Sequence, residues 1–144
     1  MINKIFLGSD HAGLPLKEHI LNYLFDRYTL ADFGTFTDMS CDYPDYAHKV
    51  ARSVNNNPDI YRGILVCGTG AGMSMVANRY INVRAILCTN IHLAEQSRRH
   101  GDANIICLGA RILDKNEAFD FIECFLTTPF DGGRHEQRLK KFRP

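Results

Sequence analysis

Five short, largely apolar runs alternate along this 144-residue chain with longer segments that have the pattern of helices. The runs that predict strands are residues 4–8, 28–34, 63–66, 83–88 and 104–109. Most of them are apolar at successive positions, which is typical of strands buried on both faces. Strands of that kind lie in parallel sheets covered by helices on both sides. The pattern therefore predicts an α/β three-layer sandwich, α/β/α, around a five-stranded parallel sheet of Rossmann-like type.

The segments between the runs carry the signals of helices. Predicted helices cover residues 14–27, 43–55, 72–79, 91–100 and 116–126. Pro15 and Pro44 stand near the start of the first two, where a missing N–H is tolerated. Asp114 is the expected N-cap of the last.

The tail after Thr128 breaks this alternation. Residues 129–133 include one proline and two glycines and predict a flexible connection, whereas residues 134–143 predict a short basic helix. Because that helix has few apolar residues to hold it on its own domain, it stays in solvent or docks on a partner subunit. No second domain is indicated, so residues 1–144 are expected to form one.

Charge and cysteine content exclude several classes of protein. A formal net charge of +1 lacks the basic excess on which general nucleic-acid and membrane-surface binding depend. No apolar stretch is long enough to cross a bilayer, and the first residues do not resemble a secretion signal. The five cysteines form no C-x-x-C pair, which argues against a disulfide framework or structural zinc and favours the reducing cytoplasm.

The most chemically distinctive stretch is Cys67-Gly68-Thr69-Gly70-Ala71-Gly72, directly after the predicted strand 63–66. Glycines at alternate positions let successive backbone N–H groups converge on one point. At the start of a helix, such a nest attracts an anion or stabilises a developing oxyanion. Cys67 lies at its mouth, where a thiol is placed for chemistry. The other cysteines in apolar runs, at 88, 107 and 124, are most simply core residues.

A second polar stretch, Asp10-His11, follows the first predicted strand. Ligands of open parallel sheets bind beyond the carboxyl ends of the strands, where the strand order reverses. If the first and third strands are neighbours, Asp10, His11 and Cys67 line one crevice. Taken singly, Asp10 is explained as a helix cap, His11 as a loop histidine and the glycines as turn residues. Their combination favours a functional site.

Several familiar motifs do not match the 67–72 loop. Met73 occupies the place of the third glycine in a dinucleotide-binding G-x-G-x-x-G loop, and no Gly-Lys-Ser/Thr sequence supports a P-loop. Met73 also stands where a phosphatase loop needs arginine. Leu65 and Thr69 stand where a nucleophile elbow needs glycine. Nucleotide binding, phosphatase chemistry and hydrolysis are therefore not indicated.

The remaining polar clusters have simple explanations of their own. His92, Glu95 and His100 are spaced three and five apart, which does not place them on one helix face, so no metal site is expected. His100 is also explained by the dipole at a helix end. Arg134 and Arg138, at i and i+4, are by themselves a solvated helix face.

Taken together, these stretches resemble ribose-5-phosphate isomerase type B, of the ribose/galactose isomerase superfamily. The matching motifs span nearly the whole chain in order and lie at residues 8–13, 42–44, 67–72, 77–78, 97–100 and 131–138. The resemblance implies interconversion of ribose 5-phosphate and ribulose 5-phosphate, a step of the pentose phosphate pathway, without a metal or organic cofactor. It also implies a homodimer, or a dimer of dimers, with shared active sites and with the basic tail 129–144 docked on the partner.

The resemblance gives the 67–72 loop a chemical role. Aldose–ketose isomerisation needs a base near neutral pH that moves a proton between carbons through an enediolate. A helix N-terminus favours thiolate over thiol, and the resemblance implies that Cys67 is this base. One branch of the family uses a glutamate directly after the last glycine, but Met73 stands there. The groups implied to stabilise the enediolate are the backbone N–H groups of Gly68, Gly70, Ala71 and Gly72 and the hydroxyl and N–H of Thr69.

Further substrate contacts follow from the same resemblance. His100 is implied to assist opening of the furanose ring, with Asp10 and Thr69 nearby. The implied substrate contacts are Asp10, His11, Tyr43 and Gly101, with Arg111, Arg134 and Arg138 for the phosphate. Many members of the family carry asparagine at the position of Gly101. One sugar contact is therefore absent, or comes from Asp102 or Asn104.

Two other functions remain open. A hexose-phosphate isomerase of the same superfamily, acting on allose 6-phosphate or galactose 6-phosphate, would share these residues. The galactose enzyme has two different subunits, whereas this chain holds a full set of catalytic residues. A non-catalytic phosphosugar-binding module would have lost the base or the ring-opening histidine, but Cys67 and His100 are both present.

Overall fold

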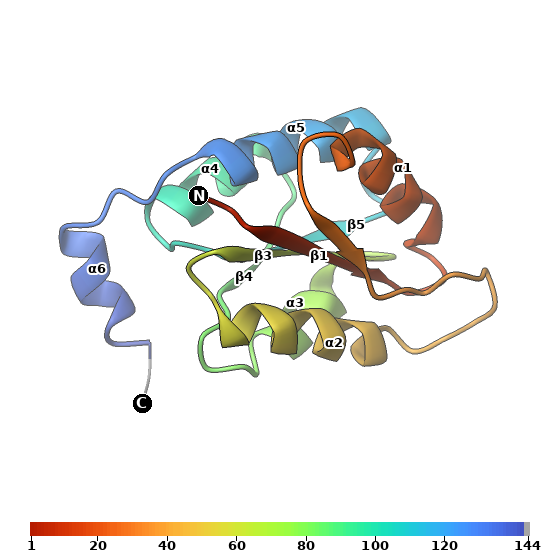
Figure 1. Ribbon diagram of the computed structural model, residues 1–144, viewed down its shortest axis with the longest axis horizontal. Coiled ribbons are helices and arrows are strands. Elements are labelled where there is room, and N and C mark those ends of the chain that lie inside the picture. Colours follow the sequence, from red (N-terminus) through yellow and green to blue (C-terminus); the bar gives the residue numbers. More distant parts are fainter. Residues whose placement is uncertain (143–144) are drawn as a thin grey trace.

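Five parallel strands form the sheet that the sequence predicts, with helices on both faces (Figure 1). The computed structural model describes residues 1–142, and Arg143 and Pro144 of the predicted tail lie outside the described residues. The strands are β1 (Lys4–Ser9), β2 (Leu30–Asp32), β3 (Tyr61–Cys67), β4 (Ala85–Leu87) and β5 (Ile105–Gly109). Their spatial order is β2-β1-β3-β5-β4, and every neighbouring pair is parallel. The predicted three-layer sandwich is confirmed.

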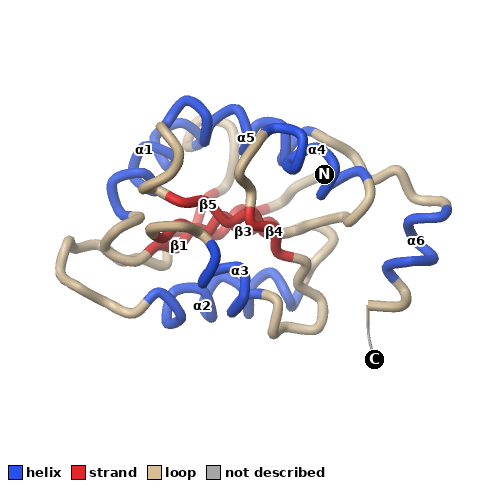
Figure 2. Tube along the Cα trace, turned by 180° about the vertical axis from the view of Figure 1, so that it is seen from behind, coloured by secondary structure: helices blue, strands red, loops and turns tan. Residues whose placement is uncertain are grey.

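The helices lie in two groups on the sheet, with one helix outside both. They are α1 (Leu14–Leu24), α2 (Tyr43–Asn56), α3 (Ala71–Ala77), α4 (Ile91–Arg99), α5 (Lys115–Thr127) and α6 (Arg134–Leu139). Figures 1 and 2 show α1, α4 and α5 on one face, α2 and α3 on the other, and α6 apart from the sandwich. Among residues 1–142, no helix has both the length and the apolar character that a membrane span requires.

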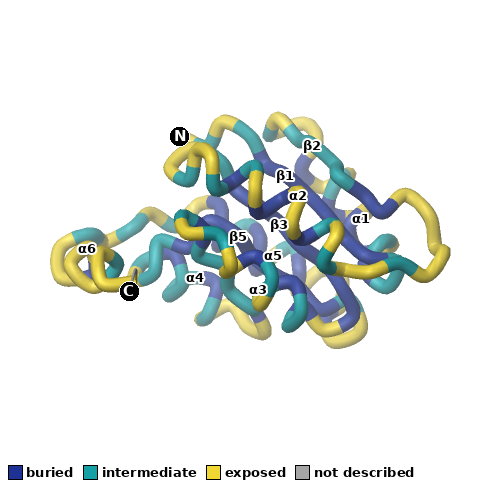
Figure 3. The backbone as a smooth tube through the Cα atoms, turned by 90° about the horizontal axis from the view of Figure 1, so that it is seen from below, coloured by how far each residue is buried: buried dark blue, intermediate teal, exposed yellow. Residues whose placement is uncertain are grey.

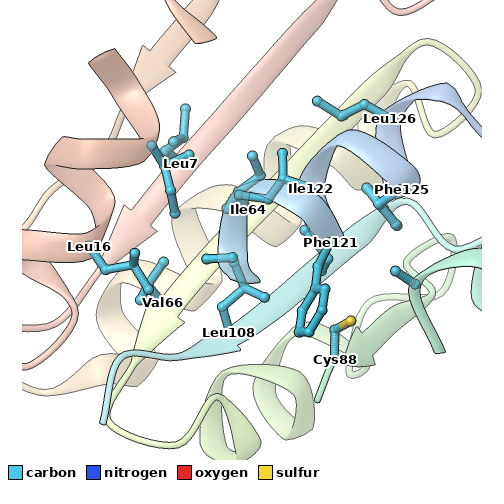
Figure 4. Packing of buried hydrophobic residues seen from close by; sticks show 14 of the residues in the cluster. Leu7, Leu16, Ile64, Val66, Cys88, Leu108, Phe121, Ile122, Phe125 and Leu126 are labelled. Carbon is cyan, nitrogen blue, oxygen red and sulfur yellow. The ribbon is translucent and has the colours of Figure 1, made fainter. Parts of the chain in front are cut away.

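Alternating side chains of the strands supply both halves of the core. Ile64 and Val66 of β3 pack in the cluster under α1, α4 and α5, part of which Figure 4 shows. Leu65 and Cys67, one residue out of phase, pack in the second cluster with residues of α2 and α3. Because both faces of each central strand are buried, residues 63–67 of β3 read as an unbroken apolar run in the sequence. Full burial of each such side chain contributes about 1.5–3 kcal/mol to stability.

The two edge strands are shorter than the sequence predicts. β2 has 3 residues where 28–34 was expected, and β4 has 3 where 83–88 was expected. Asn78, at the end of α3, covers the free edge of β4. Its side chain accepts a hydrogen bond from the N–H of Ala85 and donates one to the carbonyl of Ala85, both at 2.8 Å. An edge residue whose N–H and C=O are both occupied cannot pair with a further strand.

The two ends of the parallel strands carry different residues. We call the side of the sheet where the strands end the carboxyl edge, and the side where they begin the amino edge. β1 lies beside β3, and α1 and α2 leave on opposite faces, so the strand order switches here, which is where ligands of such sheets bind at the carboxyl edge. α4 and α5 run back toward the amino edge, where Arg98 donates to the carbonyls of Ala103 and Thr128. The tail starts at that amino edge, because the N–H of Asp131 donates to the carbonyl of Arg99 at 3.0 Å.

Candidate active site

The 67–70 loop places a thiol and backbone N–H groups side by side at the carboxyl end of β3. Cys67 is the last residue of β3 and is only 5% exposed. The N–H of Gly70 donates to its Sγ at 3.1 Å, and the N–H of Ala71 donates to Oγ1 of Thr69 at 3.4 Å. Gly70 has φ +79° and begins α3, a conformation that glycine adopts without strain. An N–H directed at sulfur stabilises negative charge on it.

The backbone that follows β5 is hydrogen-bonded to the 67–70 loop. The N–H of Ala110 donates to the carbonyl of Cys67 at 2.9 Å, and the N–H of Arg111 donates to the carbonyl of Gly68 at 3.0 Å. At Gly109, a Cβ would lie 2.7 Å from the carbonyl oxygen of Thr69. Only glycine therefore allows the two backbones to approach so closely. This approach fixes the loop on a rigid strand.

The other buried thiols have a different electrostatic environment. Burial raises the pKa of Cys88 to about 11, and burial together with the nearby Cys67 sulfur raises that of Cys107 still further. Both stay protonated at neutral pH. The N–H of Gly70 donates to the sulfur of Cys67.

Asp10 and His11 lie at the same edge, as predicted. The N–H of Asp10 donates to the carbonyl of Val66 at 3.3 Å, which places Asp10 directly beside the end of β3. Its Oδ1 accepts the N–H of Gly13 at 3.0 Å, so it does stabilise the turn before α1. Its Oδ2 has no hydrogen-bond partner among residues 1–142. Asp10 can therefore hold the turn and still offer one oxygen to a ligand.

Tyr43 and Arg111 complete this half of the site. A Cβ at Gly72 would lie 2.5 Å from Cζ and 2.9 Å from the hydroxyl oxygen of Tyr43, so the phenol lies against the start of α3. A Cβ at Gly68 would lie 3.0 Å from Nη1 of Arg111. A phenol and a guanidinium thus both lie against the 67–72 loop, Tyr43 from the start of α2 and Arg111 from the segment after β5.

His100, Gly101, Arg134 and Arg138 do not join this half of the site within one chain. They lie with α6 and the end of α4 at the amino edge, whereas Cys67 lies at the carboxyl edge. At a rise of about 3.3 Å per residue, the five residues of β5 alone separate these edges by about 16 Å. Asp10, His11, Tyr43, Arg111 and the loop lie together at the carboxyl edge, and this second group does not join them.

His135, which the sequence did not single out, stacks on His100. Their ring centroids are 4.1 Å apart and the planes differ by 7°. His135 is 8% exposed, and burial, then the charges of His100, Arg134 and Arg138, lowers its pKa. The only local signal was its place next to Arg134. The stacking partner lies far back in the sequence, so periodicity could not reveal it.

His100, Asp131 and His135 are the residues that could be considered metal ligands. One ligand atom from each lies within 4.8 Å of the others. However, the lone pairs of two stacked rings lie in parallel planes and do not converge on one point. Asp131 is also bound by Nε of Arg99 at 3.2 and 3.3 Å. The geometry is that of a stacked pair with an ion pair beside it, not of a metal centre.

Comparison with known proteins places this geometry in a family. The family model for Ribose/Galactose Isomerase matches residues 5–142, almost the whole chain. The chain belongs to this family. It is similar to ribose-5-phosphate isomerase B of Escherichia coli K12, with 37% identity over 140 residues, covering 96% of this chain and 93% of the relative. A putative sugar phosphate isomerase of Rickettsia conorii is 46% identical over 140 residues, which cover 96% of both chains.

Solved structures of ribose/galactose isomerases share the fold closely. Ribose 5-phosphate isomerase from Thermotoga maritima superposes with a TM-score of 0.92 and 48% identity, covering 96% of this chain and 95% of that one. Ribose-5-phosphate isomerase B from Mycoplasma genitalium, solved with bound ribulose-5-phosphate, has a TM-score of 0.93 and 40% identity over 96% and 92% of the two chains.

At Gly101 the resemblance leads to an expected asparagine, and the side chains of both expected substitutes are already hydrogen-bonded. Both carboxylate oxygens of Asp102 are bound, one by Arg98 and one by Arg84, each at 2.8 Å. The side chain of Asn104 accepts from the N–H of Arg84 and donates to the carbonyl of Asn82, each at 2.8 Å. The asparagine contact therefore has no replacement from these two residues.

Proposed function

We propose that this chain interconverts D-ribose 5-phosphate and D-ribulose 5-phosphate, with Cys67 as the base. The observation that carries the proposal is the N–H of Gly70 donating to the Cys67 sulfur at 3.1 Å, at the carboxyl edge where Asp10 and Tyr43 also lie. Membership of the ribose/galactose isomerase family and the ribulose-5-phosphate bound in the Mycoplasma genitalium relative support the same substrate class.

The reaction follows from the placement of these groups. The Cys67 thiolate takes the proton from C2 of the open-chain aldose, and the electron pair moves onto the C1 carbonyl oxygen to form an enediolate. The proton of the C2 hydroxyl passes to the C1 oxygen, and the thiol then returns its proton to C1 as the C2 oxygen becomes the carbonyl. N–H groups of Gly68 to Gly72 and the Thr69 hydroxyl stabilise the enediolate oxygens, and loss of one such donor typically costs about 2.7–4 kcal/mol of transition-state stabilisation.

The second half of the site would come from another copy of the chain. His100, Arg134 and Arg138 lie at the amino edge, and α6 stands off the body with most of its surface exposed (Figure 3). A homodimer, or a dimer of dimers, brings this edge against the carboxyl edge of a partner. Each site then joins the Cys67 loop of one subunit with the ring-opening His100 and the phosphate-binding arginines of the other.

The five free cysteines fit a reducing cytoplasm for this enzyme.

Steady-state kinetics on ribose 5-phosphate test the function. We expect conversion by the wild type and none by Cys67→Ala, while phosphate-ligand binding and folding persist. Cys124→Ala is the matched control, because Cys124 lies on α5 away from the loop. Full activity of Cys67→Ala would remove the proposed base. A wild type that binds but does not convert sugar phosphates would favour a non-catalytic binding module.

A hexose 6-phosphate is the second candidate substrate. The observation in its favour is Gly101, which has no side chain to contact the sugar, while the side chains of Asp102 and Asn104 are hydrogen-bonded within the chain. Kinetics on allose 6-phosphate beside ribose 5-phosphate decide between the two. A higher kcat/KM for the hexose phosphate would replace the pentose assignment.

A further inference from the structure

His11 is tied to the 35–42 loop between β2 and α2, a segment to which the proposed reaction gives no role. Nδ1 of His11 accepts a hydrogen bond from the backbone N–H of Cys41 at 3.2 Å. The thiol of Cys41 lies 3.8 Å from the same nitrogen. Both groups of Cys41 therefore lie against the same nitrogen of the imidazole ring.

This contact decides the tautomer of His11. A backbone N–H can only donate, so Nδ1 must present a lone pair. In a neutral imidazole whose Nδ1 carries no proton, the ring proton is on Nε2. A proton on Nδ1 would instead face the N–H of Cys41 and leave that N–H without its acceptor. The contact therefore favours the neutral Nε2–H form.

Side-chain contacts hold both ends of the loop that makes this contact. Lys17 is 1% exposed and donates to both carboxylate oxygens of Asp32, each at 2.6 Å. Oδ1 of Asp32 also accepts the N–H of Gly34 at 2.9 Å, which ties the loop's start to β2 and α1. At its other end, Tyr43 lies against Gly72. The loop is thus fixed at two points of the carboxyl edge, with Cys41 held between them.

We propose that Cys41, through its backbone N–H, is a positioning residue that holds His11 as a neutral Nε2–H donor to an oxygen of the substrate. The acceptor, an oxygen of a sugar phosphate, rests on the proposed isomerase function, whereas the tautomer does not. His11 then binds and orients the substrate, and proton abstraction stays with Cys67.

Nitrogen NMR on the substrate-free protein reads the tautomer directly. With ¹⁵N in the histidine rings, protonated and unprotonated nitrogens give separate shifts, and the spectrum of His11→Gln identifies the His11 signals among those of the 6 histidines. We expect a protonated Nε2 and an unprotonated Nδ1 near neutral pH. A proton on Nδ1, in a neutral or doubly protonated ring, overturns the proposal. This readout stands even if the protein proves inactive on ribose 5-phosphate, so failure of the function and failure of the tautomer are distinguishable.

Two substitutions of His11 test the donor role. His11→Gln places an amide N–H near the position of Nε2, whereas His11→Asn places one only near Nδ1. Loss of a hydrogen bond to a charged group should lower kcat/KM about 10- to 100-fold in His11→Asn, and His11→Gln should recover most of that loss. Equal losses in both variants contradict donation from Nε2.

Two substitutions of Cys41 separate its backbone from its side chain. Cys41→Ala keeps the N–H and is expected to keep the Nε2–H signals of His11. Cys41→Pro has no N–H, so the His11 signals should move toward a mixture of tautomers. Unchanged signals in a folded Cys41→Pro protein would exclude Cys41 as the positioning residue. If Cys41→Pro does not fold, the wild-type spectrum and the variants His11→Gln and His11→Asn still decide the proposal.

Discussion

Single residues of this chain take their chemistry from the backbone groups beside them. Cys67 and Cys107 lie on adjacent strands and both are buried, but only Cys67 receives an N–H, from Gly70. Burial and the Cys67 sulfur keep Cys107 protonated by raising its pKa. His11 shows the same principle, since one N–H from Cys41 selects its tautomer. Residue type alone does not separate these cysteines, whereas their positions do, because Cys67 ends β3 and Cys107 lies in the middle of β5.

His135 carries a prediction about pH. Burial, then the charges of His100, Arg134 and Arg138, lowers its pKa, while Asp131 acts in the opposite sense. The folded protein therefore takes up this proton less readily than the unfolded chain. The attachment of α6 should be intact above the unfolded pKa of about 6.5 and should weaken as the pH falls below it. Hydrogen exchange of the α6 amides, corrected for the intrinsic rate, measures this.

The control for this prediction keeps the stack and removes the titration. His135→Phe can stack on His100 but cannot be protonated, so protection of α6 should lose its dependence on pH. His19→Phe changes an exposed histidine on α1 and should behave as wild type. If the α6 amides lose protection on lowering the pH to the same extent in His135→Phe and in the wild type, the pH dependence comes from another group.

At the scale of elements, local patterns in the sequence predict which helices and strands exist, but not where the edge strands end. The apolar runs predict the central strands, and the Asp114 cap predicts the start of α5. Both signals are local properties of the chain. β2 and β4 fall short of their runs since each has one neighbouring strand. The hydrogen bonds between the Asn78 side chain and the Ala85 backbone cannot be predicted from the sequence either, because they depend on where α3 ends in space.

Asn78 therefore carries a prediction about stability. Its amide makes two 2.8 Å hydrogen bonds with the backbone of Ala85 at the free edge of β4. Asn78→Ala removes both and should lower the free energy of unfolding by about 1–3 kcal/mol, as measured by denaturant titration. Asn78→Asp keeps the acceptor and loses the donor, so an intermediate loss is expected. A change within error in Asn78→Ala would mean that water replaces both bonds.

At the scale of the whole molecule, the fold separates residues that the proposed reaction uses together. Cys67, Asp10 and Tyr43 lie at the carboxyl edge, whereas His100 and Arg134 lie at the amino edge. The sequence predicts each group but not the separation, because motif order along a chain carries no information on which edge of the sheet a helix end reaches. The direction of the helices does carry this information, because every helix that follows a parallel strand returns its C-terminus to the amino edge. Motifs at strand ends and motifs at helix ends therefore lie on opposite sides.

Complementation between two inactive variants tests whether partner subunits close this distance. Cys67→Ala and His100→Ala should each be inactive alone. In a mixed dimer, the intact Cys67 of one chain meets the intact His100 of the other in one of the two sites. With random pairing, co-expression should restore roughly a quarter of wild-type activity. The pair Cys67→Ala and Asp10→Asn changes the same edge and leaves no mixed site intact, so it should restore none. Absence of recovery in the first pair, with mixed dimers present, would place both groups of residues in separate sites.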